Sequence, residues 1–225
     1  MNNGTNYINL EDISIRNQGY LEIMKDIYEI SNECEIKSYI WGGYVIDILK
    51  GSLIREHSDL DVFTENMLEK LDKLKCLYES RGYEIEYFED INMLEIRKGE
   101  LHASFNCLDI DGEIAKWRHI GREGTVYFPY KWLDSNPREF YNVKVYTSGF
   151  KFEYAIKTKV QMLTPIWKPR EKDKVSIKYL QEILHKENVS PDEIYKWIWS
   201  YNPYWYKKGY DEFFRPTIAY PLSSK

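Results

Sequence analysis

The sequence predicts an α+β (mixed α/β) fold, in which a mixed, mostly antiparallel sheet is flanked by helices and followed by a mainly helical C-terminal part. Apolar residues recur at three- and four-residue steps over 18–32 and 67–82, the period of amphipathic helices. Strand-like segments at 83–88, 91–97 and 101–108 follow one another, with acidic or glycine-containing turns between them, as neighbouring strands do. Helical patterns dominate the last third of the chain.

A strand, a glycine turn and a short helix are expected after the first helix. Residues 38–41 are rich in strand formers, Gly42 and Gly43 interrupt them, and residues 44–50 resume a helical pattern. Gly51 can end that helix, because glycine adopts the left-handed backbone conformation that often follows a helix.

The second half of the chain predicts shorter elements. Strands are expected at 125–128 and 143–146, and helices at 153–163 and 172–185. Residues 190–193 combine a capping serine, a proline at the first helical position and a glutamate at the third, which predicts a last helix ending before residue 202. We expect a soft boundary near 112–120, with a core over 1–115 and a C-terminal strand and helix region over 116–225 that packs on it.

Length, charge and cysteine content limit the kind of protein. With 225 residues the chain can form one well-filled domain, or a core with a smaller companion. Its 31 basic and 36 acidic residues give a net charge of −5, which suits a small cationic substrate better than a long polyanion. Three cysteines without metal-binding spacing indicate neither disulfides nor a zinc site. A polar N-terminus and the lack of a long apolar run predict a cytoplasmic protein without a membrane partner.

Two aspartates follow a polar connection and begin a second strand at 59–63. Asp59 and Asp61 are one residue apart, so in a strand both carboxylates emerge from one face. Two adjacent carboxylates repel each other, and a hard divalent cation such as Mg²⁺ relieves this while also binding triphosphate oxygens. A lone Asp-x-Asp pair also occurs on ordinary solvated strand edges, so the pair alone is weak support for a metal site.

The glycine turn before the short helix adds to this pattern. Gly42 and Gly43 have no side chains to hold phosphate oxygens away from backbone amides at a helix N-terminus. A tight turn with unusual backbone angles is the ordinary alternative for two glycines. Arg55, His57 and Ser58 then stand immediately ahead of the acids and are further candidates for nucleotide contact.

The stretch from Trp41 to Gly51, followed by Arg55 to Val62, resembles the lincosamide and aminoglycoside nucleotidyltransferases, a branch of the DNA polymerase beta-like superfamily. The resemblance implies the nucleotidyltransferase fold, with Mg²⁺ as cofactor and ATP or another nucleoside triphosphate as donor. It implies transfer of a nucleoside monophosphate, with AMP as the first choice, to a hydroxyl of a small acceptor, and release of pyrophosphate. An aminoglycoside or lincosamide antibiotic is the implied acceptor.

The resemblance also implies roles for single residues. Gly42 and Gly43 would contact the phosphates, and Asp59 and Asp61 would bind Mg²⁺. Arg55 would neutralise phosphate charge or serve the structure, two roles that we weigh equally. For His57, with Asp47, hydrogen bonding that pins the loop is the favoured interpretation.

The family carries a third carboxylate on a neighbouring strand, as metal ligand or general base. This sequence offers Glu100, our first choice as catalytic residue and metal ligand, and alternatively His102 as the base. Lys172 falls where family members carry a basic residue near the nucleotide, although Ser176 replaces the acid expected after Asp173.

Other functions stay open at this stage. A nucleotidyltransferase acting on tRNA or protein is one alternative, and a non-catalytic nucleotide-binding module without the third acid is another. Clustered aromatic residues near the C-terminus fit core packing or a homodimer contact first, and an acceptor site second. They are Tyr195, Trp197, Trp199, Tyr201, Tyr204, Trp205, Tyr206, Tyr210, Phe213 and Phe214.

Overall fold

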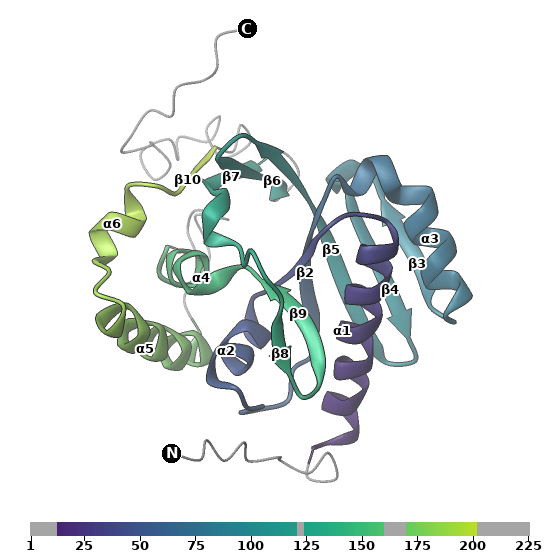
Figure 1. Cartoon of the computed structure of the whole chain (residues 1–225), viewed down its shortest axis with the longest axis horizontal. Coiled ribbons are helices and arrows are strands. Elements are labelled where there is room, and N and C mark those ends of the chain that lie inside the picture. The colour runs from purple at the N-terminus through teal and green to yellow at the C-terminus, as the bar shows by residue number, and fades with distance from the viewer. Residues whose placement is uncertain (1–12, 121–123, 160–169, 202–225) are drawn as a thin grey trace, which may run out of the picture.

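A mixed sheet of ten strands organises the protein in the computed structural model, which describes residues 13–120, 124–159 and 170–201. The main path of the sheet is β10-β7-β6-β5-β2-β1-β9-β8, and β4 and β3 extend it from β5 (Figure 1). Within the described residues only the β1–β9 and β2–β5 pairs are parallel. The predicted α+β class with a mostly antiparallel sheet is confirmed.

The elements follow the expected order closely in the first half of the chain. The strands are β1 (Ser38–Trp41), β2 (Leu60–Glu65), β3 (Glu84–Phe88), β4 (Met93–Lys98), β5 (Leu101–Asp111), β6 (Ile114–Ile120), β7 (Gly124–Pro129), β8 (Arg138–Phe140), β9 (Val143–Thr147) and β10 (Trp199–Tyr201). The helices are α1 (Ile15–Glu33), α2 (Gly43–Lys50), α3 (Leu71–Ser80), α4 (Gly149–Thr158), α5 (Glu171–Lys186) and α6 (Pro191–Tyr195), with short 3-10 turns η2 (Met67–Lys70), η3 (Glu89–Ile91) and η4 (Tyr130–Trp132).

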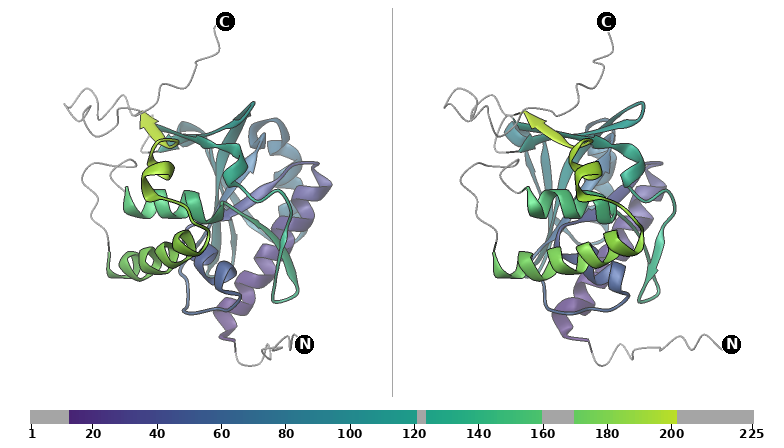
Figure 2. Two further views of the ribbon diagram at one scale, coloured as in Figure 1. Left: turned by 60° about the vertical axis from the view of Figure 1, so that its left-hand side comes forward. Right: turned by 90° about the vertical axis from the view of Figure 1, so that its left-hand side faces the viewer.

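Helices pack on both faces of the sheet. Successive strand residues point to opposite faces, and Val62 and Phe63 of β2 accordingly join different apolar cores. Val62 packs with α1 and α3 residues, whereas Phe63 packs with residues of α4, α5 and α6. The last three helices lie together on one side of the molecule (Figure 2). The site described below lies on this second face.

The C-terminal part differs from the expectation in one respect. Ser190 caps α6 as predicted, with its Oγ accepting from the Asp192 amide at 3.3 Å. The helix ends at Tyr195, before residue 202 as predicted, but it is short, and a strand that was not predicted follows it. This strand, β10, adds to the edge of β7, with Ser200 paired to Val126, because this edge offers backbone hydrogen bonds that a helix would leave unused.

Besides β10, two further strands were not predicted, and one of them crosses the expected boundary. β6 pairs with β5 on one side and with β7 on the other, so the sheet is continuous through residues 114–120. The short β8 pairs with β9. The division at 115 and 116 stays a prediction. Within the described ranges, none of the helices combines the length and apolar character needed to cross a bilayer.

Candidate active site

The glycine turn and the second aspartate lie side by side. Trp41, the last residue of β1, pairs with Asp61 of β2, and Gly42 follows as the N-cap of α2 with a φ of +84°. A Cβ on Gly42 would lie 2.8 Å from the Asp61 Oδ2 atom. Both the backbone angle and the close carboxylate therefore require glycine at this position. A Cβ on Gly43 would lie 2.7 Å from His57 Nδ1 and Arg55 Nη2, so the second glycine is equally confined.

The two aspartates occupy different environments. Asp59 is exposed and stands one residue before β2, with its Oδ1 accepting from the Ser58 hydroxyl at 3.0 Å. Asp61 lies inside the strand and is partly buried. Burial, followed by the negative charges of Asp59 and Glu153, raises the pKa of Asp61 to about 7. A cation bound between these carboxylates would remove the repulsion and keep both of them ionised.

The loop ahead of the acids is pinned by a buried histidine. His57 Nε2 lies 2.9 Å from Asp47 Oδ2, and the His57 ring stacks on Tyr44 with centroids 3.9 Å apart. The same Asp47 oxygen accepts from the Ile54 amide at 3.4 Å. The expected hydrogen bond between Asp47 and His57 is thus present. Contact of His57 with a nucleotide stays a prediction, as it does for Ser58 and for the exposed Arg55.

Helix α1 supplies further anchors that the sequence did not reveal. Arg16 donates from Nε to the His57 carbonyl at 2.9 Å and from Nη2 to the Ser58 carbonyl at 3.1 Å. The Tyr20 hydroxyl also donates to the Ser58 carbonyl, at 2.6 Å. The N-terminal end of α1 therefore holds the backbone that leads into Asp59.

The register of β5 bears on the third catalytic group. Ser104 pairs with Asp61, and continuing the parallel register one step places His102 level with Asp59. Glu100 is exposed in the turn between β4 and β5 rather than in the strand where we expected it. It stands four residues from Ser104, roughly 13 Å at about 3.3 Å per residue. Among the described residues, no three His, Cys, Asp or Glu side chains form a metal-binding group, so the metal role of Glu100 stays a prediction.

Basic and acidic groups of α4 and α5 face the two aspartates. The charges of Lys157 and Arg170 oppose the rise in the Asp61 pKa, which places both cations near this carboxylate. Arg170 also donates to Asp173, and these hydrogen bonds outweigh burial and hold the pKa of Asp173 below its usual range. Lys172, the residue expected near the nucleotide, is exposed and is not among the groups whose charge influences Asp61 most.

Sequence reasoning overlooked three of these residues. Glu153 and Lys157 form an acid–base pair four residues apart in an expected helix, a pattern that usually marks a solvated ion pair. Here the pair is instead buried, with side-chain exposures of 0% and 11%. Arg170 precedes its helix, and its local pattern offered no signal.

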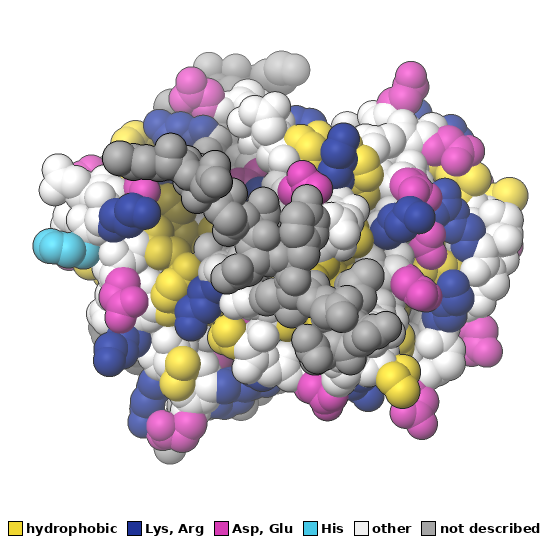
Figure 3. All heavy atoms as spheres, turned by 60° about the horizontal axis from the view of Figure 1, so that its bottom comes forward, with side chains coloured by type: hydrophobic (Ala, Val, Ile, Leu, Met, Phe, Trp, Pro, Cys, Tyr) yellow, Lys and Arg dark blue, Asp and Glu magenta, His cyan; other side chains and the backbone are white. Residues whose placement is uncertain are grey.

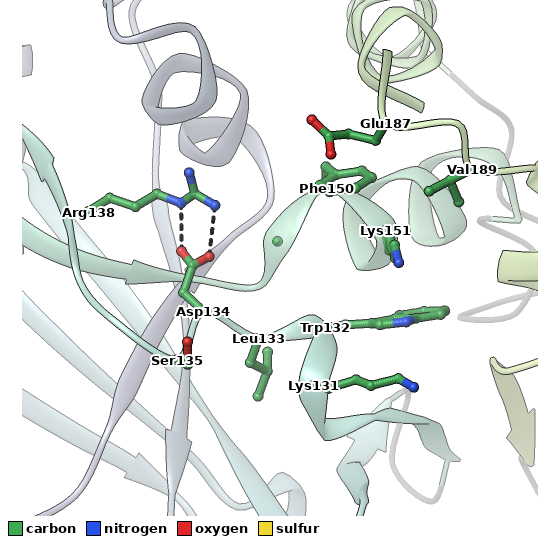
Figure 4. A pocket seen from close by; sticks show the side chains of 11 residues that line it. Lys131, Trp132, Leu133, Asp134, Ser135, Arg138, Phe150, Lys151, Glu187 and Val189 are labelled. Carbon is green, nitrogen blue, oxygen red and sulfur yellow. Dashed lines mark hydrogen bonds and ion pairs between the residues drawn. The ribbon is translucent and has the colours of Figure 1, made fainter. Parts of the chain in front are cut away.

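A separate cavity of about 410 Å³ lies at the start of α4 (Figure 4). Its wall includes Trp132, Asp134, Arg138 and Phe150, and the Arg138 guanidinium is paired with the Asp134 carboxylate on one side of it. None of the candidate site residues lines this cavity. It is therefore distinct from the corner that holds Asp59 and Asp61.

Comparison with known families decides the identity of the chain. The model of the aminoglycoside-2''-adenylyltransferase family matches residues 23–142, more than half of the 225 residues, and this match includes the glycine turn and both aspartates. The chain belongs to this family. It is therefore a nucleotidyltransferase, and the resemblance seen in the sequence is confirmed.

Solved structures support the fold of this family member. The antibiotic-resistance factor ANT(2'')-Ia in solution aligns with a TM-score of 0.61 at 14% identity, covering 87% of this chain and 95% of that one. ANT(2'')-Ia crystallised with adenylyl-2''-tobramycin aligns with a TM-score of 0.57 at 16% sequence identity, and the alignment covers 76% of this chain and 92% of that one. The lincomycin-bound lincosamide antibiotic adenylyltransferase LnuA aligns with a TM-score of 0.53 at 17% sequence identity, and the alignment covers 76% of this chain and 98% of that one. No curated protein sequence matches the chain.

Proposed function

We propose that this family member transfers AMP from ATP to a hydroxyl group of an aminoglycoside antibiotic, with Mg²⁺ as cofactor and pyrophosphate as the second product. The observation that carries the proposal is the meeting of Asp59 and Asp61 with the Gly42–Gly43 turn in a chain of this family. The structures with an adenylylated aminoglycoside and with lincomycin support an antibiotic acceptor.

The residues present fit a magnesium ion shared with the nucleotide. Mg²⁺ is commonly held by one or two carboxylates together with substrate phosphates and water, and it does not need a complete protein cage. Asp59 and Asp61 would supply these carboxylates. Burial, followed by the charges of Asp59 and Glu153, raises the pKa of Asp61, and a bound cation would oppose this by favouring the ionised carboxylate. When bound, Mg²⁺ would neutralise negative charge on the triphosphate.

Cations on the opposite side would hold the rest of the triphosphate. Lys157 and Arg170 act electrostatically on Asp61 from α4 and α5, so phosphates bound at Asp61 would lie between the acids and these two groups. Gly43 is the first residue of α2, and the amides of a first helical turn have no partner within the helix, so we propose that they donate to the phosphates. We propose that the two cations neutralise the phosphates, with Arg55 and Lys172 as the alternatives expected from sequence.

The acceptor would lie along the exposed part of the second sheet face. Asp61, Ser104, Glu95 and Glu86 follow one another in register across β2, β5, β4 and β3. Glu95 in this row is buried and already paired with Arg97, so the exposed Glu86 is the carboxylate beyond Asp61 that would attract an acceptor carrying ammonium groups. This observation favours an aminoglycoside over a lincosamide and over a nucleic acid. Acidic and basic side chains are interspersed over the face seen in Figure 3, and such a surface does not favour tRNA either.

The proposed chemistry is a single displacement. The acceptor oxygen forms a bond to the α-phosphorus, the bond from that phosphorus to the bridging oxygen breaks, and pyrophosphate leaves with the electron pair. The hydroxyl proton passes to a base, for which we propose His102, because it lies level with Asp59 and its side chain is partly exposed. Glu100 is the alternative, and its place in the turn makes it the weaker candidate.

The test is a product analysis by mass spectrometry. Purified protein is incubated with Mg²⁺, each of the four nucleoside triphosphates, and separate panels of aminoglycosides, lincosamides and tRNA. We expect the mass increment of one AMP on an aminoglycoside in the ATP reaction, and no increment with Asp59→Asn or Asp61→Asn. Full turnover by either variant would exclude the metal site. An increment on tRNA alone, or tight Mg·ATP binding without any product, would favour one of the other two functions.

A second comparison identifies the nucleotide-binding cation. Arg170→Gln should raise the KM for Mg·ATP about tenfold, because a charge-assisted contact to phosphate is lost. Lys172→Gln, at the same end of α5, serves as the matched control and should leave this KM unchanged. The opposite ranking would assign the nucleotide contact to Lys172.

A further inference from the structure

Helix α4 carries a carboxylate that is completely buried. Glu153 has an exposure of 0% and faces β1 and the glycine turn rather than solvent. A carboxylate without water is costly unless it is paired and hydrogen bonded. An apolar residue would serve packing alone at such a position, so the contacts of Glu153 indicate what the charge does.

The two carboxylate oxygens of Glu153 have different partners. Oε1 accepts two hydrogen bonds, from the Gly42 amide at 2.7 Å and from the Ser148 hydroxyl at 2.8 Å. Oε2 is buried and accepts no hydrogen bond in the described part of the chain, but it lies 3.3 Å from the Lys157 ammonium. Glu153 therefore joins the glycine turn to the cation that stands near Asp61.

This arrangement confines Gly42 from two sides. Its amide is held by Glu153, and its Cα faces the Asp61 carboxylate so closely that a Cβ would lie 2.8 Å from Oδ2. The Gly42 N–H donates to Glu153, and the amides that start α2 are left to face a ligand. Any shift of Glu153 would displace the turn relative to Asp61.

From this geometry we propose that Glu153 is a positioning residue for nucleotidyl transfer: through the reach of its side chain it fixes Gly42 against Asp61. The inference rests on the proposed function, since it assigns the turn and Asp61 to the same reaction. Glu153 does not touch the substrates, because it is buried behind the turn. Its effect is on the alignment of the groups that do.

Two conservative variants separate reach from charge. Glu153→Gln keeps an oxygen at the length needed to accept from Gly42 but removes the charge, whereas Glu153→Asp keeps the charge and shortens the side chain by one methylene. We expect Glu153→Gln to keep kcat within about threefold of wild type. We expect Glu153→Asp to lower kcat about 10- to 100-fold, the usual effect of losing a residue that orients a metal or catalytic ligand. The KM for the acceptor should change little in both variants.

Ser148→Ala is the matched control. It removes the other donor to the same Oε1 atom and leaves the Gly42 hydrogen bond in place. Its kcat should stay near wild type although a buried hydrogen bond is lost. If the role of Glu153 is purely structural, the three variants should have similar kcat values when each is assayed under conditions in which it is fully folded.

An NMR measurement follows the contact without relying on turnover. An amide proton that donates a short hydrogen bond resonates downfield, and its signal moves upfield when that hydrogen bond lengthens or breaks. The Gly42 signal should keep this position in Glu153→Gln and Ser148→Ala and move upfield in Glu153→Asp. The affinity for Mg·ATP is recorded in the same samples, and only Glu153→Asp should bind more weakly.

The outcomes are distinct. Glu153→Asp more active than Glu153→Gln, or an unmoved Gly42 resonance in Glu153→Asp, would overturn the positioning role. If wild-type protein transfers nothing, or Asp61→Asn keeps full turnover, the proposed function fails by itself. The inference is then judged by the Gly42 resonance and the Mg·ATP affinities.

Discussion

Replacing Asp61 with asparagine should stabilise the protein while it abolishes catalysis. Burial and neighbouring charges raise the pKa of this carboxyl from 3.8 to about 7. The ionised form is therefore disfavoured in the folded state, and its cost is absent below about pH 3.8 and grows as the pH rises towards 7. At about 1.36 kcal/mol per pKa unit, the cost is roughly 2 kcal/mol at pH 5 and roughly 4 kcal/mol at pH 8.

Asparagine has no such ionisation cost, so the stability of the variant relative to wild type should increase as the pH increases. The expected gain between pH 5 and pH 8 is roughly 2 kcal/mol, or about 4 to 8 °C in Tm for a domain of this size. Calorimetry of metal-free wild type and Asp61→Asn at both pH values measures it. Mg²⁺ should raise the Tm of wild type at pH 8 and leave that of the variant nearly unchanged.

Asp59→Asn is the control for this prediction, because Asp59 is exposed and its substitution should change the Tm little. If Asp61→Asn melts below wild type at pH 8, or if the difference between the two proteins does not grow from pH 5 to pH 8, the account of Asp61 as a carboxylate destabilised by burial and repulsion is wrong.

Other predictions concern the turn and the loop. His57→Ala leaves the buried Asp47 carboxylate without its partner and should cost roughly 3 kcal/mol of unfolding free energy in urea titrations; an unchanged midpoint would contradict this. Gly42→Ala should cost about 1–3 kcal/mol more than Gly51→Ala, because both have positive φ but only Gly42 has a neighbour against its Cβ. Equal losses of unfolding free energy in the two variants would show that the Asp61 side chain moves away from the added Cβ at little cost. Chelation with EDTA should abolish transfer and Mg²⁺ should restore it; transfer that persists without metal would argue against the cofactor.

Local pattern was sufficient for much of the first half of the chain. Ser38–Trp41 was expected as a strand and is β1, and the helical period of the following segment matches α2. The expected strand around Asp59 and Asp61 is β2, although Asp59 stands just outside it. These elements have strong periodicity, and glycines end β1 and α2, so neighbours in the sequence determine them.

Local pattern failed where a distant strand decides the structure. The strand that follows the helix after Ser190 was missed, because β10 forms only by pairing with β7, more than 70 residues away in the sequence. The sequence around residues 199–201 contains no sign that the edge of β7 is available for pairing. Six of the clustered aromatic residues, from Tyr204 to Phe214, lie outside the described residues, so their use as packing, dimer contact or acceptor site stays a prediction.

The sequence alone determined the fold class, the family and the pair Asp59 and Asp61 behind a glycine turn, because these depend on periodicity and on residues close together in the chain. Only the tertiary structure decided that Asp61 is partly buried while Asp59 is exposed, that Ser104 rather than an acid pairs with Asp61, and that Glu153 holds Gly42 from 111 residues away. Burial and strand register depend on how the whole chain packs, and this information is not contained in any short segment.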